Sequence, residues 1–150
     1  MARRWFAKLF VLYLCVLFGL TLGGFYHLGA TRNLIPFRTI EHDLRKGGWE
    51  FLVNFVGNLV ITLPIGWFLP LLLGRKCNAV RVGATAMGLS VVIEVLQGLS
   101  RRRVADVDDV ILNTVGGLCG YGIWLILRDR VLRSRWFRSE SADERLPIDP

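Results

Sequence analysis

The sequence predicts an all-α membrane protein, a bundle of about four transmembrane helices with an interfacial or re-entrant loop after the first helix. Three observations favour this fold class. Hydrophobic residues make up 53% of the 150-residue chain, more than a water-soluble domain of this size can readily bury. These residues are concentrated in four long segments, and most charged residues lie between the segments. Since none of the segments alternates apolar and polar residues over its length, a β-barrel is not expected.

Each of the four apolar segments is long enough to cross the hydrocarbon core of a bilayer as a helix. They extend over residues 5–26, 51–73, 80–99 and 110–127. The first contains Lys8, and we interpret it as a retained helix because its apolar run exceeds the core of a usual signal peptide. The third contains Arg81 and Glu94. A charge deep in a bilayer is costly, so Glu94 needs polar partners, a wet cavity or protonation.

The segment that follows the first helix, residues 33–40, is too apolar for an ordinary soluble loop. We predict an interfacial or re-entrant turn there, lying over the polar end of the bundle. His42, just after this segment, is interpreted as a surface residue.

The basic residues predict the topology of the chain. The four helices place both chain ends on the same side of the membrane, and that side carries more Lys and Arg residues than the other. The positive-inside rule therefore places the N- and C-termini in the cytoplasm. The net charge of +7 is interpreted as topology signals and contacts with anionic lipid, and no nucleic-acid partner is expected. We assign residues 1–138 to one transmembrane domain and the polar residues 139–150 to a disordered cytoplasmic tail.

Small residues and tryptophans predict how the helices pack. Gly116 and Gly120 form a small-xxx-small pair, and Gly19 and Gly23 form another in the first helix. Such pairs permit close approach of two helix backbones, so we expect helix contacts at both. Trp124 is expected in an interface belt or in contact with lipid.

Polar side chains converge at one end of the predicted bundle. The second helix carries two asparagines four residues apart, the third carries a glutamate and a glutamine three apart, and the fourth begins among aspartates. Because the second helix starts where the third and fourth meet their loop, these groups share one end, which the predicted topology places outside. The candidate pocket comprises Asn54, Asn58, Glu94, Gln97, Arg101, Arg102, Arg103, Asp106, Asp109 and Asn113.

Several functions fit such a pocket. The first is binding of an anionic lipid headgroup or a lipid-linked cell-wall component beside the arginines. The second is an enzyme acting on a phosphorylated or acylated lipid, with Glu94 as general base and the carboxylates of residues 106–109. The third is a proton-linked transporter subunit, which would need to form a homo-oligomer. Purely structural roles are a further alternative, in which Asp106 and Asp109 cap the fourth helix.

Cofactors and metals are not expected from the sequence. Three aspartates, Asp106, Asp108 and Asp109, make at most a weak metal site, since their spacing is not diagnostic. The three cysteines are too dispersed for a disulfide framework or zinc spacing. No phosphate-cradling glycine loop or nucleophile elbow is present in the sequence.

Four blocks of sequence together resemble the VanZ-like family. They are Asn33-Leu-Ile-Pro-Phe-Arg-Thr-Ile40, Asn54-Phe-Val-Gly-Asn58 leading to Pro64-Ile-Gly66, Ser90-Val-Val-Ile-Glu94-Val-Leu-Gln97, and Asp106-Val-Asp-Asp109-Val-Ile-Leu-Asn113-Thr-Val-Gly-Gly117. The blocks occur in the family's order and cover residues 33–127, which we take as the core of the domain.

The resemblance implies a small multi-pass protein of the bacterial cytoplasmic membrane. The best-known member of the family is associated with low-level resistance to the glycopeptide teicoplanin. The resemblance carries over motif positions and no catalytic residue; these positions are Asn54, Asn58, Glu94, Gln97, Arg103, Asp106, Asp109 and Asn113. The chain departs from the family pattern at Arg101-Arg102-Arg103-Val104-Ala105, where a shorter polar turn is expected.

Overall fold

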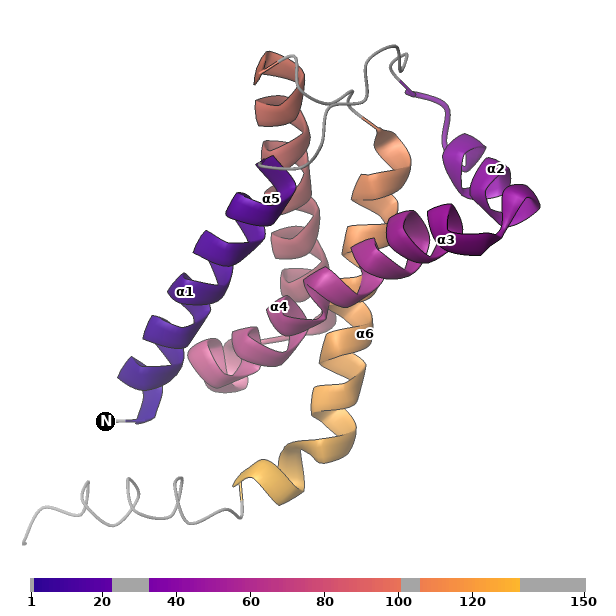
Figure 1. The fold of residues 1–150 in the computed structure, drawn as a ribbon. Coiled ribbons are helices and arrows are strands. Elements are labelled where there is room, and N and C mark those ends of the chain that lie inside the picture. The colour runs from indigo at the N-terminus through magenta and orange to yellow at the C-terminus, as the bar shows by residue number, and fades with distance from the viewer. Residues whose placement is uncertain (1, 23–32, 101–105, 133–150) are drawn as a thin grey trace, which may run out of the picture.

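The computed structural model describes residues 2–22, 33–100 and 106–132, and these residues fold into helices without a sheet (Figure 1). In chain order the elements are α1 (Ala2–Leu22), α2 (Arg38–Lys46), α3 (Gly48–Phe51), the π-helix η1 (Leu52–Val56), α4 (Gly57–Leu73), the 3-10 helix η2 (Gly74–Lys76), α5 (Ala79–Ser100) and α6 (Val107–Leu132). One isolated bridge pairs Asn33 with Asp106.

Four stretches are long and apolar enough to cross a membrane, as the sequence predicts. They are Arg3–Leu22, Leu52–Lys76, Ala79–Leu99 and Val107–Arg128. The predicted all-α fold class is therefore confirmed, and the chain is a multi-pass membrane protein. The last span begins three residues before its predicted start, because Asp106 accepts a hydrogen bond from the backbone N–H of Asp108 (2.9 Å) and so caps α6.

Small residues bring α4 and α6 into backbone contact, which confirms the packing role predicted for Gly116 and Gly120. A Cβ atom added at Gly120 would lie 2.0 Å from the carbonyl oxygen of Leu63, and one added at Gly66 would lie 2.0 Å from that of Gly117. No side chain fits at these distances, so only glycine permits the contact.

The other predicted glycine pair does not pack in the same way. A Cβ atom added at Gly19 meets nothing within 4 Å, and Gly23 lies outside the described residues. The expected contact at Gly19 is therefore wrong for the described part of the chain. The reason is that α1 meets the bundle through aromatic side chains instead.

An aromatic cluster joins α1 to α4. The rings of Phe10, Tyr13 and Phe68 lie within 5.7–6.3 Å of one another, measured between centroids. The Tyr13 hydroxyl donates a hydrogen bond of 2.7 Å to the carbonyl oxygen of Ile61. Phe10 and Tyr13 also cover the small core of buried residues, which includes Ile65 and Val82. This cluster fixes α1 against a helix that lies far from it in sequence.

Tyr13→Phe is expected to destabilise the protein by about 0.6–1 kcal/mol, because it removes one interhelical hydrogen bond and keeps the ring packing. Thermal unfolding in detergent micelles measures the change, with Cys15→Ala on the exposed side of α1 as the control. A loss as large as that of Tyr13→Ala would show that the hydroxyl, and not the ring, holds α1.

The tryptophans divide between the surface and the interior. Trp49 is 78% exposed, as an interfacial residue should be. Trp124 is only 7% exposed and packs edge-to-face on Trp67, with 5.6 Å between ring centroids. The predicted interface or lipid contact for Trp124 is therefore wrong. In an apolar helix, neither charge nor polarity distinguishes the face that meets protein from the face that meets lipid.

The described chain between the first two spans, residues 33–51, includes the predicted loop of residues 33–40 and the short helices α2 and α3, at the side of the α6 N-terminus (Figure 1). Large apolar side chains are exposed along it: Leu34, Ile35, Phe37, Leu44 and Trp49. The charged residues of α2 lie beside them, and Glu41 and Arg45 form an ion pair of 2.5 Å. This mixture of exposed apolar and charged groups is typical of a membrane–water interface.

Candidate functional site

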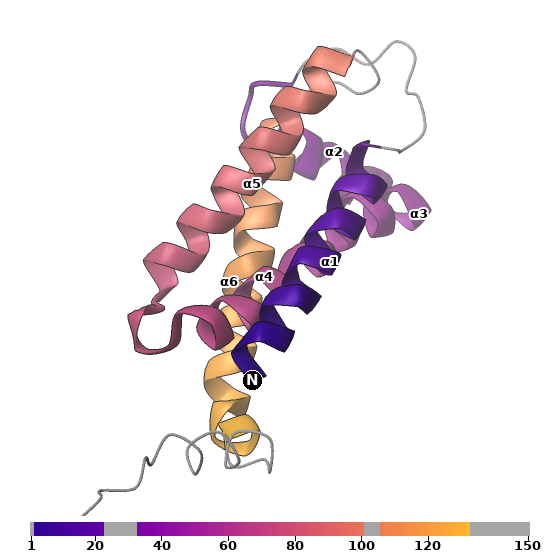
Figure 2. The same ribbon diagram turned by 90° about the vertical axis from the view of Figure 1, so that its left-hand side faces the viewer.

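The polar end of the bundle is where the start of α6, the end of α5, α2 and the start of the second span come together. Figures 1 and 2 show α2 beside the α6 N-terminus in both views, with α5 ending at the same end. Six polar side chains at this end are buried within the protein: Asn33, Asp43, Glu94, Gln97, Asp108 and Asn113. Polar groups buried in this way need hydrogen-bond partners within the protein.

Asp108 holds the loop of residues 33–40 against α6. Its side chain is fully buried. One carboxylate oxygen accepts the backbone N–H of Phe37 (2.5 Å), and the other accepts those of Thr39 (2.7 Å) and Ile40 (3.2 Å). Phe37 adopts a left-handed conformation with φ of 67°, which non-glycine residues rarely adopt. Asp108 thus binds the N-terminal end of α2, where free backbone N–H groups point.

A second group of contacts joins Asn33 and Thr39 to the cap of α6. Asn33 donates through Nδ2 to Asp106 Oδ1 and to Thr39 Oγ1, both at 2.9 Å. The Thr39 hydroxyl donates to Asp106 Oδ2 at 2.6 Å. The backbone N–H of Val107 donates to the carbonyl oxygen of Asn33 at 3.1 Å. The loop and the α6 N-terminus therefore form one hydrogen-bonded unit.

Glu94 links α5 to this unit. Its Oε2 accepts the backbone N–H of Asp106 at 2.8 Å, and only 7% of the residue is exposed. The contact gives the embedded carboxylate a partner at the positive end of the α6 dipole, which offsets part of the cost of burial. The geometry also turns Glu94 toward the space between α5 and α6.

A groove of about 410 Å³ lies between α5 and α6 at this end. Among the described residues that line it, two are carboxylates, Glu94 and Asp106, and the others are apolar or glycine, including Val95 and Leu99. Val95 is 55% exposed and Leu99 is 75% exposed, so the groove opens sideways from the bundle. It combines a long apolar wall with acceptor oxygens at one end.

Five of the predicted pocket residues form hydrogen bonds elsewhere at the same end: Asn54, Asn58, Gln97, Asp109 and Asn113. Each bond joins two different segments: Asn58 donates to Asp109 (2.7 Å), Asn54 to Asp43 (3.1 Å), Asn113 to Ser90 (2.8 Å), and Gln97 to the carbonyl oxygen of Thr21 (2.7 Å). The predicted residues thus share one end but lie in several pairs, and Gln97 faces α1 instead of the groove.

A π-helix explains why the two asparagines part. Residues 52–56 form η1, whose wide turn allows the N–H of Gly57 to reach the carbonyl oxygen of Leu52. Asn54 lies within the wide turn and Asn58 follows it, so their spacing of four does not give the common face expected in an α-helix. Asn54 therefore meets Asp43 in α2, whereas Asn58 meets Asp109 in α6.

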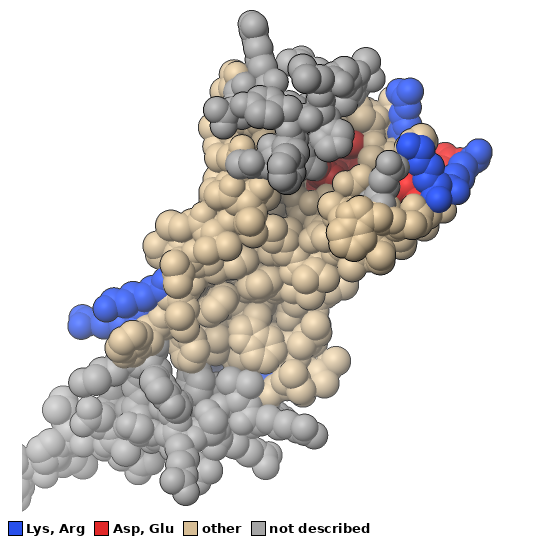
Figure 3. Space-filling model, viewed as in Figure 1, with Lys and Arg blue, Asp and Glu red and all other residues tan. Residues whose placement is uncertain are grey.

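The charge of this end is acidic over the described residues. Figure 3 shows acidic surface between α2 and the undescribed grey residues, with Lys and Arg of α2 at the outer edge. Arg101, Arg102 and Arg103 lie outside the described residues and follow Ser100 directly in the chain. Within residues 2–22, 33–100 and 106–132, no group of three or more His, Cys, Asp or Glu side chains is placed to hold a metal ion.

The sequence did not indicate four members of this network, which are Asn33, Thr39, Asp43 and Ser90. It also did not indicate that Asp108 anchors the loop. Asn33 and Thr39 stand in the first of the quoted motif blocks, which was a usable signal. Both residues bond to Asp106, which lies 73 residues from Asn33 and 67 residues from Thr39 in the sequence, so spacing alone could not reveal the pairs.

A family model described as VanZ/LLP1 matches residues 10–128 of the chain. The match covers the four candidate spans almost completely and includes the whole polar end. Separate searches of curated proteins and of solved structures each found no match to the chain.

Proposed function

The chain belongs to the VanZ/LLP1 family. We propose that it binds an anionic lipid in the groove between α5 and α6, with the lipid headgroup at the polar end of the groove. The observation that carries the proposal is the buried Glu94 carboxylate on the wall of an apolar groove that opens sideways. The ligand class is a lipid whose headgroup carries both phosphate and hydrogen-bond donors, such as hydroxyl groups.

The apolar wall supports an acyl or prenyl chain as the occupant. Val91, Val95 and Leu99 follow one another along the exposed side of α5, and Val110 of α6 lines the same groove. A chain lying here would contact protein on two sides while still continuous with the bilayer. Ligand pockets of a few hundred Å³ with apolar walls and few polar groups are typical of small-molecule sites.

The polar end of the groove supports the headgroup chemistry. Glu94 and Asp106 accept hydrogen bonds when ionised, so hydroxyl or ammonium donors match them better than a bare phosphate. The phosphate is assigned to Arg101, Arg102 and Arg103, which adjoin the end of α5 in sequence and suit phosphate oxygens. The lipid thus has one recognition element for each part of its headgroup.

The predicted topology would place this site at the outer leaflet, with both termini in the cytoplasm. Lipid-linked cell-wall components combine phosphate, sugar hydroxyl groups and a long apolar chain, so they belong to the same ligand class. Their capture at the outer face would offer a route to altered glycopeptide susceptibility.

The proposal predicts that protein purified in mild detergent retains anionic lipid, and that Arg101→Gln/Arg102→Gln/Arg103→Gln loses most of it. Native mass spectrometry counts the retained lipid in each variant. The matched control is Arg38→Gln/Arg45→Gln/Lys46→Gln, which removes three exposed charges from α2 at the same end. We expect about a tenfold fall for the first triple variant, equivalent to 1.4 kcal/mol, and little change for the control.

Equal losses in the two triple variants would show that surface charge alone attracts the lipid, and the proposed site would be abandoned. The enzyme alternative gives a different result in the same preparation. There the retained lipid would be converted to a product over time, and Glu94→Gln would stop the conversion while the lipid stayed bound.

A further inference from the structure

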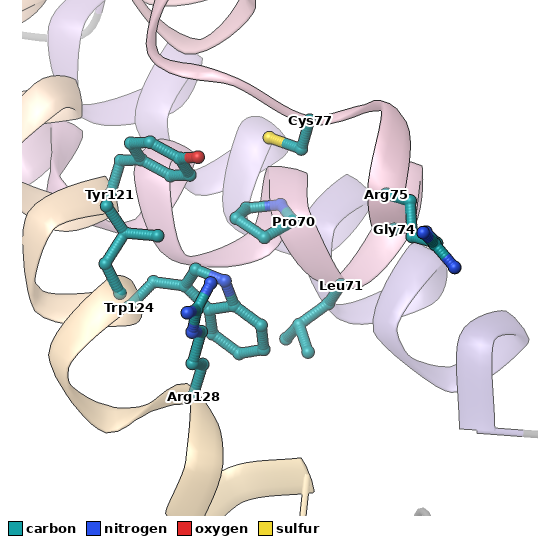
Figure 4. A pocket seen from close by; sticks show the side chains of 9 residues that line it. Pro70, Leu71, Gly74, Arg75, Cys77, Tyr121, Trp124 and Arg128 are labelled. Carbon is teal, nitrogen blue, oxygen red and sulfur yellow. The ribbon is translucent and has the colours of Figure 1, made fainter.

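A second pocket lies at the opposite end of the bundle, between the end of α4 and the last turns of α6. Its volume is about 500 Å³. Figure 4 shows Tyr121, Trp124 and Arg128 projecting from α6, with Pro70 and Cys77 on the facing side and the Arg75 side chain pointing outward at the edge. The pocket shares no residue with the groove between α5 and α6.

The chain builds this pocket by ending α4 abruptly. Gly74 takes φ of 56°, and its backbone N–H donates to the carbonyl oxygen of Pro70, which closes the helix. The chain then turns through η2, placing Arg75 at the edge of the pocket, and reaches Cys77 before α5 begins. On α6, residues 121, 124 and 128 are spaced by three and four, so they share one face.

The pocket differs from the polar end in its charge. Among the described residues that line it, two are arginines and none is acidic. The guanidinium groups come from separate elements, η2 and α6, and both residues are exposed at the rim. The floor is formed by buried Pro70 and Trp124. An anion bound beside Arg128 would therefore meet its guanidinium and the aromatic wall of Trp124, with exposed Arg75 as a second positive charge at the rim.

We propose that this pocket binds a phosphate group, with Arg75 and Arg128 as its cationic partners, and that the phosphate belongs to the headgroup of an anionic lipid. Arginine is suited to phosphate because its planar guanidinium donates two parallel hydrogen bonds. Trp124, the Tyr121 ring and the apolar ends of the neighbouring helices supply the partly apolar surface that the glycerol region of a lipid requires.

This site is independent of the proposed function, because it lies at the other end of the protein. The predicted topology assigns this end to the cytoplasmic leaflet, where anionic lipids attract basic groups. The protein would then hold lipid at both membrane surfaces, through separate residues.

Cys77 provides a local reporter for the site. It lines the pocket and is half-buried, whereas Cys15 and Cys119 are exposed elsewhere on α1 and α6. In a Cys15→Ala/Cys119→Ala background, a maleimide therefore reports on this pocket alone. Burial raises the pKa of the Cys77 thiol, an effect that nearby Arg81 partly opposes, so labelling rates must be compared at one pH.

The test measures the labelling rate of Cys77 in the full chain, reconstituted in nanodiscs of phosphatidylcholine with or without phosphatidylglycerol. Bound headgroup should slow labelling at least about threefold in the anionic discs. Arg75→Gln/Arg128→Gln should remove the protection. Arg3→Gln/Arg4→Gln, which deletes two exposed charges from α1, should leave it intact. A third arm adds glycerol 3-phosphate to phosphatidylcholine discs.

The outcomes separate the two sources of phosphate. Protection by phosphatidylglycerol alone supports a lipid headgroup, whereas equal protection by glycerol 3-phosphate supports the phosphate site and assigns it to a soluble ligand. The inference is overturned if neither protects, or if the Arg75→Gln/Arg128→Gln variant is protected as well as the parent. Circular dichroism of each variant establishes that the helices are intact, which is expected because both arginines are exposed.

Discussion

Gly120→Ala is expected to destabilise the protein more than any other single methyl addition to α6. The new Cβ atom would lie 2.0 Å from the carbonyl oxygen of Leu63 and 2.9 Å from its carbon. Both are backbone atoms of α4, so relief requires the two helices to separate. Overpacking of this kind costs about 1–3 kcal/mol, and the upper end is expected because no flexible side chain can yield. Thermal unfolding in detergent measures the loss.

Gly122→Ala is the matched control, because it lies two residues away on the same helix and its Cβ atom would meet nothing within 4 Å. It should be neutral, or stabilising by up to about 1 kcal/mol through helix propensity. The packing account fails if the two variants have the same melting temperature.

Asp108→Ala is expected to release the loop of residues 33–40 from α6 while the four spans stay helical. The substitution removes the shared acceptor of the backbone N–H groups of Phe37, Thr39 and Ile40. An unpaired buried donor costs about 1–3 kcal/mol, so the total loss is several kcal/mol unless water enters. Amide hydrogen exchange at these three residues should speed up by about a hundredfold or more.

The control for Asp108→Ala is Glu41→Ala, which removes an exposed carboxylate that pairs only with the exposed Arg45 in the described contacts. Exposed pairs contribute about 0–1 kcal/mol, so exchange at the three amides should hardly change. Unchanged exchange in Asp108→Ala would mean that the loop is held by the contacts of Asn33 and Thr39 alone.

The sequence was sufficient to predict the four spans and the end at which polar groups gather. Length and apolar composition determine where a helix can cross a bilayer, and the aspartates and asparagines stand at the ends of particular helices. The glycine spacing also predicted the α6 contact correctly. These features depend on neighbouring residues in the chain, which a single sequence displays directly.

The pairing of the polar residues could not be predicted in the same way. Glu94 bonds to a backbone N–H of Asp106, and Asp108 bonds to three backbone N–H groups, so neither contact depends on the identity of a partner side chain. The π-helix at residues 52–56 changed the relative direction of Asn54 and Asn58, and no glycine or proline within it marks its position. The sequence also does not show which face of an apolar helix meets lipid, since Trp124 was expected at the surface and is buried.

The central claim is that the groove between α5 and α6 holds a lipid selected by its headgroup, and photo-crosslinking tests it most directly. A benzophenone amino acid is placed at Leu99, which lines the groove and is 75% exposed, or at Val53, which is 49% exposed at the start of the second span and outside the groove. Both positions are exposed and apolar at the same end of the bundle, so the comparison tests selectivity. The account predicts that Leu99 captures anionic lipid well above its share of the membrane, that Val53 captures lipids in bulk proportion, and that Glu94→Ala removes the enrichment. Bulk proportions at Leu99 in the parent protein would contradict the account.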